Sequence, residues 1–254
     1  MAVIPISLQL YTVRDLAAKD FAGTLKEVSN IGYRNVELAG YGNLKTAKEA
    51  KKALDDAGLK VSGAHAPIDA LEKNLNQVLD ENAELQNTTV ICPWLPEQRR
   101  KDAAGWKQCA ETLSNIGRAC HEKGVDFAYH NHSFEFEKFD GKTGLDILFD
   151  NCQPHLVRAE VDVYWVKHGG EDPVTRINQL GRRVILLHLK DMTPGEDRKF
   201  APVGTGILDF KAILDVASRL GVKYGVVEQD NCYELPPLNA IRISYQNLQK
   251  LGAA

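Results

Sequence analysis

The sequence predicts an α/β protein of the (β/α)8 TIM barrel class, and three observations lead to that prediction. The chain has 254 residues, a length that α/β barrels routinely reach as one unit. Eight short apolar runs alternate with stretches of helical periodicity, and eight parallel strands are the number that closes a barrel. No segment has the composition of an interdomain linker, so we expect residues 1–254 to form a single domain.

The predicted strands are short runs rich in apolar and β-branched residues, and they are spread over the whole chain. They span residues 4–10, 35–39, 60–65, 88–92, 125–132, 156–163, 184–189 and 224–228. An open doubly wound sheet is the alternative, and it often carries a glycine-rich turn after its first strand. The segment after residue 10 has no such turn, which favours the closed barrel.

The stretches between the strands carry apolar side chains at steps of three and four residues, which places them on one face of a helix. The clearest stripes are Leu71, Leu75, Val78, Asn82 and Leu85; Trp106, Cys109, Leu113, Ile116 and Cys120; and Phe210, Ile213, Ala217 and Leu220. We expect the cysteines of the second stripe to be packing residues.

Local signals predict where several helices begin and end. Asp69 followed by Glu72 is a variant of the capping box, and Asp172 before Pro173 places a cap ahead of a proline at the first helical position. Glycines that favour a left-handed conformation follow four helical stretches, at Gly58, Gly124, Gly181 and Gly221.

Composition and charge exclude several classes of function. Lys and Arg total 31 against 34 for Asp and Glu, so the net charge of −3 argues against nucleic acid as a partner. No run approaches 18 apolar residues, and the first seven residues do not form a signal peptide, so we expect no membrane partner and a cytoplasmic location. A secreted form with a trimmed leader is the alternative. Five cysteines without a Cys-x-x-Cys pair indicate reduced thiols.

Polar side chains gather at the ends of the later strands, where barrel enzymes place their reactive groups. Residues two apart in a strand share a face, so His130 with His132, Glu160 with Asp162, and His188 with Lys190 can each point inward together. The eighth predicted strand ends with Glu228, Gln229 and Asp230. Charged groups inside a barrel must be paired or metal-bound, so these four strand ends predict a metal or catalytic cluster.

Several polar residues outside that cluster have simpler interpretations. Glu37 alone is expected to be a helix-capping or surface carboxylate, and Lys190 with Asp191 alone would be an ion pair at the rim. His65 alone is expected to be a hydrogen-bonded polar residue at a strand end. The remaining histidines, His121, His155 and His168, are expected at the surface. Trp94 and Trp165 are either pocket walls or packing residues.

Six motifs, in order along the chain, resemble one known family. They are LQLYTVR at 8–14, YHNHSFEF at 129–136, DVYW at 162–165, LHLKDM at 187–192, VGTG at 203–206 and VEQD at 227–230. Together they resemble the sugar phosphate isomerase/epimerase family of the xylose isomerase-like TIM barrel superfamily. The resemblance covers essentially the whole chain, and it is specific for the family but not for the substrate.

The resemblance implies one divalent metal ion at the strand ends, with Mn expected first and Mg, Co, Zn or Fe as alternatives. Asp162, His188 and Glu228 match the family's ligands residue by residue. The family's remaining ligand, usually a glutamate, falls on His130 here, so the fourth ligand is either His130 or Glu135 from the following segment. Carboxylates dominate this site in the family, which favours Glu135.

The resemblance also implies an activity, that of a metal-dependent sugar isomerase or epimerase that removes a proton next to a polarised carbonyl. His132 and Glu228 are the expected proton-transfer groups, and Lys190 is expected to help hold the enediolate. The residues expected to bind the sugar are His65, Glu160, His130, Trp165 and Tyr11.

Three alternatives remain open for the same residues. The first is a lyase or dehydratase acting on a keto-sugar, a keto-glycoside or an inosose. The second is a sugar-binding barrel without turnover. A DNA-repair endonuclease like endonuclease IV is disfavoured by the net charge of −3. The small-molecule partner is a sugar or keto-sugar in the first two cases, and a homo-oligomer is left open.

Overall fold

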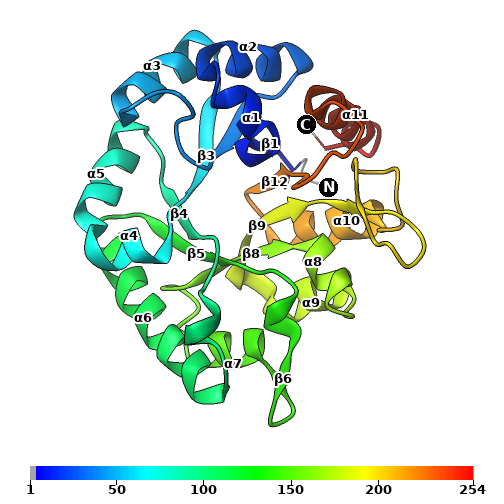
Figure 1. The fold of residues 1–254 in the computed structure, drawn as a ribbon. Helices are drawn as coiled ribbons and strands as arrows, with labels where there is room; N and C mark the ends of the chain where they lie inside the picture. The colour runs from blue at the N-terminus through cyan, green and yellow to red at the C-terminus, as the bar shows by residue number, and fades with distance from the viewer. Residues whose placement is uncertain (1–3, 254) are drawn as a thin grey trace.

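Eight parallel strands close into a barrel in the computed structural model, which describes residues 4–253 (Figure 1). The barrel strands are β1 (Ile6–Gln9), β2 (Asn35–Leu38), β3 (Lys60–His65), β4 (Thr89–Cys92), β5 (Asp126–His130), β8 (Arg158–Asp162), β9 (Val184–Leu189) and β12 (Tyr224–Val227). β1 pairs with both β2 and β12, so the barrel has no free edge. The predicted (β/α)8 TIM barrel is therefore confirmed.

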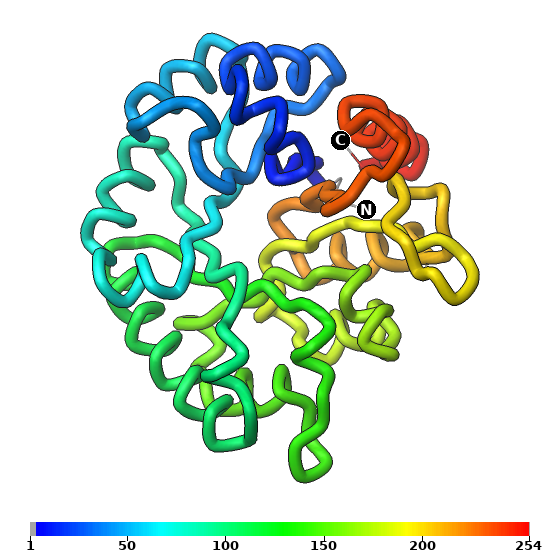
Figure 2. Tube along the Cα trace, in the orientation of Figure 1, coloured from blue at the N-terminus to red at the C-terminus, as the bar shows by residue number. Residues whose placement is uncertain are grey.

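Helices surround the strands, and the chain runs once around the ring from blue to red (Figure 2). They are α1 (Arg14–Ala17), α2 (Phe21–Ile31), α3 (Ala47–Asp56), α4 (Ile68–Lys73), α5 (Leu75–Glu84), α6 (Ala103–Glu122), α7 (Gly144–Asp150), α8 (Val163–His168), α9 (Pro173–Leu180), α10 (Phe210–Leu220) and α11 (Pro237–Lys250). Within residues 4–253, no helix combines the length and apolar character needed to cross a membrane.

Short hairpins and 3-10 turns lie outside the barrel strands and the main helices. Two antiparallel hairpins are formed by β6 (Lys138–Phe139) with β7 (Lys142–Thr143), and by β10 (Asp191–Met192) with β11 (Phe200–Ala201). Single 3-10 turns occur at Leu10–Val13, Glu97–Arg99, Phe134–Phe136 and Gly181–Arg183. The hairpin of β10 and β11 follows the seventh barrel strand directly, so it lies beside the strand ends that the sequence marks as polar.

Most predicted helix ends are confirmed. Asp172 caps α9 by accepting a hydrogen bond from the Thr175 N–H, and Pro173 is the first helical residue. The four glycines expected to end helices all have positive φ, with values of 68° at Gly58, 72° at Gly124, 55° at Gly181 and 75° at Gly221.

The capping box expected at Asp69 is wrong. α4 begins one residue earlier at the buried Ile68, directly after Pro67, whose fixed φ suits a helix start. Asp69 therefore lies inside the first turn and pairs with Lys73, and Glu72 pairs instead with Arg99. Asn74, with φ −137° and ψ 35°, then interrupts the expected helix, and α5 continues the apolar stripe.

The core lies between the helices and the barrel, and a smaller cluster fills the barrel itself. The stripe of α6 is buried as expected, at Trp106, Cys109, Leu113, Ile116 and Cys120. Ile91, Ala128, Ile185 and Leu186 form the smaller cluster. Ala128 and Leu186 precede His130 and His188 by two residues, so this apolar cluster forms a floor beneath the polar strand ends.

Replacing Gly117 with alanine is expected to lower the free energy of unfolding by about 1–3 kcal/mol. A Cβ at this position would overlap the carbonyl oxygen of Leu156, where α6 packs against the barrel. Alanine is a better helix former than glycine, so a loss of stability must come from the close packing at this position and not from helix propensity. Urea unfolding followed by circular dichroism measures it. Asn115→Ala on the exposed face of α6 is the control. A Gly117→Ala protein as stable as the parent would contradict the close approach.

Candidate functional site

A cavity of about 720 Å³ opens at the carboxyl ends of the barrel strands. Its lining includes most of the expected catalytic and sugar-binding residues: Tyr11, His65, His130, His132, Trp165, Lys190 and Glu228. Trp94 also lines it, so both tryptophans in question are pocket walls. A cavity of this size suits a small organic ligand. Of the residues expected to bind sugar, Glu160 does not line the cavity and is fully buried.

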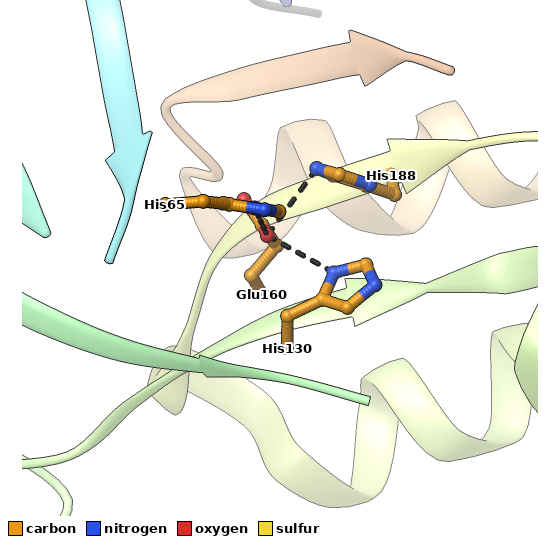
Figure 3. A group of neighbouring side chains, drawn as sticks. All are labelled: His65, His130, Glu160 and His188. Carbon is orange, nitrogen blue, oxygen red and sulfur yellow. Dashed lines mark hydrogen bonds and ion pairs between the residues drawn. The ribbon is translucent and has the colours of Figure 1, made fainter. Parts of the chain in front are cut away.

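A lower cluster inside the barrel includes His65, His130, Glu160 and His188 (Figure 3). Glu37 completes this cluster through its contacts with His65 and His188. One oxygen of Glu160 lies 3.0 Å from His65 Nε2, 3.0 Å from His130 Nδ1 and 3.2 Å from His188 Nε2. Oε1 of Glu37 lies 3.0 Å from His65 Nε2 and 2.7 Å from His188 Nε2. Two carboxylates therefore share three imidazole rings inside the barrel.

An upper cluster of Asp162, His188, Lys190, Glu228 and Asp230 lies around the ends of β8, β9 and β12. His188 Nδ1 is 2.8 Å from Glu228 Oε2 and 4.0 Å from Asp162 Oδ2. Lys190 Nζ is 3.0 Å from Asp162, 2.6 Å from Glu228 and 2.9 Å from Asp230. The ammonium group thus forms ion pairs with three carboxylates and hydrogen-bonds to Asp230.

Two histidines of the lower cluster also face residues of the upper cluster, through the opposite ring nitrogen. His188 presents Nε2 to the lower carboxylates and Nδ1 to the upper ones. His130 presents Nδ1 to Glu160, and its Nε2 lies 3.7 Å from Asp162 Oδ2. A carboxylate that accepts an N–H from one ring nitrogen fixes the tautomer and leaves the other nitrogen to act as a ligand.

The carboxylates of the lower cluster set the charge of its histidines. Burial alone would lower the pKa of His65, but Glu37 and Glu160 outweigh it and raise this pKa to about 9. The same competition holds the pKa of His188 well above its usual range. Burial raises the pKa of Glu37, yet His188 and His65 outweigh it and hold this pKa well below its usual range. In contrast, burial and the neighbouring His188 hold the pKa of His130 well below its usual range.

Lys190 sets the charge of the upper cluster. Burial would lower the pKa of Lys190, but Asp162, Glu228 and Asp230 outweigh it and hold this pKa well above its usual range. Burial likewise opposes ionisation of Glu228, yet Lys190 and His188 lower its pKa well below its usual range. Burial raises the pKa of Asp162 to about 6 despite the same two cations. Glu228 is therefore a weak proton acceptor in this arrangement.

His132 differs from the other histidines of the cavity. Burial, with a contribution from Lys190, lowers its pKa to about 3, so the ring is neutral at pH 7. Its Nδ1 has no hydrogen-bond partner among the described residues. The ring stacks on Phe134 and lies 5.6 Å from the ring of Trp165. His132 thus lines the cavity with a neutral ring whose buried Nδ1 has no partner in the described part of the chain.

Glu135 does not lie at the cluster, contrary to the preference for it as the fourth metal ligand. The Tyr129 hydroxyl donates to its Oε1 at 2.6 Å, and the His132 N–H donates to its Oε2 at 2.8 Å. The 3-10 turn Phe134–Phe136 returns this carboxylate to Tyr129, which alternates with His130 along β5 and so faces away from the barrel interior. Among the described residues, His130 is the side chain from β5 that reaches Asp162.

The interpretation of Glu37 as a capping or surface carboxylate is wrong. Its side chain is fully buried, accepts a hydrogen bond from Gln9 Nε2 at 2.8 Å and joins the lower cluster. The one sequence signal was its place inside the short apolar strand β2, where an unpaired carboxylate would be costly. Asp230 was noted at a strand end, but its pairing with Lys190 was not anticipated.

The expected rim ion pair of Lys190 with Asp191 is also wrong, because neighbouring residues in a strand face opposite sides. Lys190 points into the cavity. Asp191 is fully buried on the other side, where it accepts backbone hydrogen bonds from Met192, Gly204, Gly206 and Leu208.

The expected surface histidines are mostly confirmed. His121 and His155 are exposed, and His168 is half-buried beside Tyr164 and Trp165.

The polar atoms of both clusters fit a divalent cation. Nitrogen and oxygen atoms of His65, His130, Glu160 and His188 lie within 4.8 Å of one another, as do those of Asp162, His188 and Glu228. The buried oxygens Glu37 Oε2 and Glu160 Oε1 have no hydrogen-bond partner in the described part of the chain. Imidazole and carboxylate ligands suit Mn, Fe, Co and Zn.

Comparison with known proteins identifies relatives over nearly the whole chain. Residues 25–250 match the family model for the xylose isomerase-like TIM barrel. An inosose dehydratase from Clostridium beijerinckii is 21% identical, with 85% of this chain and 84% of that protein covered.

Two crystal structures share the fold. A sugar phosphate isomerase/epimerase from Parabacteroides distasonis superposes with a TM-score of 0.84 at 25% identity, covering 98% of this chain and 94% of that one. The probable 3-DHS dehydratase of Bacillus anthracis superposes with a TM-score of 0.76 at 14% identity, covering 97% and 99%.

Replacing Lys190 with methionine is expected to lower the free energy of unfolding by about 3–5 kcal/mol at pH 8, since it leaves buried carboxylates unpaired. The folded-state pKa of these carboxylates then rises above the unfolded value of about 4, so the loss should grow as pH increases from about 5 to 8. Urea unfolding with a chelator present measures the loss at both ends of this range.

The matched control for this variant is Lys211→Met, which removes an exposed ion pair with Asp215 on α10. This change should alter stability by less than about 1 kcal/mol at either pH. A loss in Lys190→Met that is equal at both pH values, or larger at pH 5, would contradict the assigned charges.

Proposed function

Because the chain belongs to the xylose isomerase-like TIM barrel family, we propose that it is a metal-assisted lyase that acts on a keto-sugar or a related cyclic ketone. In the proposed reaction a proton leaves the carbon next to the carbonyl group, and a hydroxyl or alkoxy group leaves the carbon beyond it. The observation that carries the proposal is His132, a neutral imidazole in the cavity lining whose Nδ1 has no partner among the described residues.

The residues proposed to hold the ion are His130 through Nε2, Asp162 through Oδ2, His188 through Nδ1 and Glu228 through Oε2. Their nitrogens and oxygens converge at the ends of four adjacent strands. A divalent ion bound there would polarise the substrate carbonyl and lower the barrier to loss of the neighbouring proton. Manganese is the first expectation, and a mixed imidazole and carboxylate set also suits zinc, cobalt and iron.

His132 is proposed to move the proton. Its low pKa keeps the ring free to accept the proton at neutral pH, and the same low pKa makes the protonated ring a strong acid. The proton removed from carbon is then passed to the departing oxygen, which leaves as water or an alcohol. A positioned base of this kind contributes about 10²–10⁴-fold to the rate.

Lys190 and Glu228 are proposed to hold neighbouring groups in position and to stabilise the charge that develops during the reaction. Lys190 holds three carboxylates in fixed directions, and Glu228 is occupied by ion pairs with Lys190 and His188. Epimerisation usually needs a proton-transfer group on each face of the substrate. Of the two groups expected to transfer protons, His132 and Glu228, the ion pairs of Glu228 leave His132 as the free one. Elimination needs only a single base, so it fits this arrangement better than epimerisation does. The dehydratase names of the Clostridium and Bacillus relatives agree with this choice.

Isomerase or epimerase activity is the second candidate. It is favoured by the Parabacteroides structure, which has the higher TM-score and identity of the two structures compared. A single base can also move a proton between neighbouring carbons on one face, so His132 would serve an aldose–ketose isomerisation. Tyr11, His65 and Trp165 line the cavity in a way that suits binding of a sugar ring in either reaction.

Elemental analysis of the tag-free protein is expected to find about one divalent ion per chain, and almost none in the Asp162→Ala/His188→Ala variant. The variant removes two proposed ligands from adjacent strands. Inductively coupled plasma mass spectrometry measures the ratio, and circular dichroism checks folding. Glu135→Gln is the matched control and should keep its metal, because Glu135 lies outside both clusters. Loss of metal from the control, or its retention in the double variant, would refute the proposed ligands.

His132→Gln is expected to lower kcat by about 10²–10⁴-fold while the metal content stays unchanged. The assay is a panel of inososes, 3-dehydroshikimate and keto-glycosides in D₂O, followed by NMR. Elimination gives an unsaturated ketone and a free leaving group, whereas isomerisation gives a stereoisomer or positional isomer without loss of a group. His121→Gln, on the exposed surface, should keep full activity. Undiminished turnover by His132→Gln would exclude His132 as the base.

A further inference from the structure

The cavity has two chemically different halves. The half built from the segments after β1, β2 and β4, together with Pro67 after β3, presents Tyr11, Ala39, Gly40, Pro67, Pro93 and Trp94, none of which carries a charge. The half built from the ends of β5, β8, β9 and β12 and from β11 presents all the other ionisable groups except His65, and it also carries two aromatic rings: His130, His132, Lys190, Glu228 and Asp230, with Trp165 and Phe200. His65, from β3, lies at the boundary. The reacting part of a substrate must lie against the second half, which leaves the first half to contact something else.

The loop where barrel enzymes often bind phosphate is already filled by a carboxylate of the chain itself. That loop follows the seventh barrel strand. Here the N–H groups of Gly204 and Gly206 both donate to Asp191 Oδ2, at 3.0 and 2.7 Å. Met192 and Leu208 donate to Oδ1 of the same side chain at 2.8 and 3.1 Å. These four donors are therefore not free for a phosphate group.

The cavity also lacks an uncommitted cation among the described residues. Lys190 is the lysine in its lining, and its ammonium group is ion-paired with three carboxylates. Arg14 is near the mouth but does not line the cavity. Its guanidinium lies 4.1 Å from the centre of the Tyr11 ring and donates to the Tyr11 carbonyl oxygen. A phosphorylated sugar would bring two negative charges to a wall that already carries Glu228 and Asp230.

We infer that the substrate is an unphosphorylated glycoside, with its reacting sugar against the ionisable half and a second ring against Tyr11 and Trp94. The inference rests on the proposed function, because it names the substrate class of the same site. The side chains of Tyr11 and Trp94 are 43% and 45% exposed although both line the cavity. Exposed aromatic faces at a cavity mouth offer a flat apolar surface that either a second sugar ring or an aryl group covers.

The test compares binding of neutral and charged probes to the purified metal-loaded protein by isothermal titration calorimetry. The probes are methyl β-D-glucopyranoside, phenyl β-D-glucopyranoside, cellobiose and glucose 6-phosphate, with the galactose series in parallel. The phenyl glycoside or the disaccharide should bind about two- to tenfold more tightly than the methyl glycoside. Glucose 6-phosphate should bind no more tightly than methyl β-D-glucopyranoside. The aryl and disaccharide arms distinguish the two kinds of second ring.

Variants of Trp94 assign the preference to the apolar half. Trp94→Ala should abolish the advantage of the two-ring probes and leave the affinity for the methyl glycoside unchanged, and Trp94→Phe should keep most of the advantage. Leu251→Ala, an exposed apolar side chain outside the cavity, is the control. Tighter binding of glucose 6-phosphate, a preference that survives in Trp94→Ala, or no binding of any neutral glycoside would each overturn the inference.

These outcomes are separable from those for the proposed function. Two-ring binding that depends on Trp94, without turnover of any keto-sugar, would refute the lyase and keep the substrate class. Turnover of a phosphorylated keto-sugar in preference to its neutral counterpart would keep the lyase and refute the substrate class.

Discussion

The need to neutralise buried carboxylates governs the whole mouth of this barrel. Glu37, Glu160, Asp162 and Glu228 are almost completely removed from water, and a carboxylate in that position is unfavourable unless a cation or donors face it. One lysine and three histidines supply that compensation. The positions of these side chains are thus fixed by charge as much as by packing, which gives the site the rigidity that metal binding and catalysis require.

The same charge balance separates supporting from reacting groups. In His130 and His188, one ring nitrogen contacts a carboxylate of the lower cluster, so only the other nitrogen faces the upper cluster. The Nδ1 atom of His132 has no hydrogen-bond partner within residues 4–253, and the ring is neutral. The two histidines of the segment 130–132 are therefore both neutral but have different contacts, because His130 faces Glu160 and His132 lines the cavity.

Local patterns were sufficient for the fold and for much of the site, and they failed where the deciding contact was distant. Strand alternation and strand-end polarity placed His130, Asp162, His188 and Glu228 correctly, since each depends on its own strand. Glu37 could not be recognised, because its partner His188 lies 151 residues away. Glu135 was placed wrongly because a 3-10 turn directs its side chain to Tyr129, and the periodicity of the sequence does not predict such a short turn.

The division of the cavity has a consequence for how such a protein diverges. The segments after the first four barrel strands carry the uncharged wall with Tyr11 and Trp94, and the last four strands and their segments carry nearly all ionisable groups of the lining, together with Trp165 and Phe200. Each segment is anchored by its own strand. Substitutions in the early segments, or their exchange for other segments, can therefore change the accepted ligand without disturbing the later segments. Selection can therefore act on recognition and on chemistry as two independent halves of one ring.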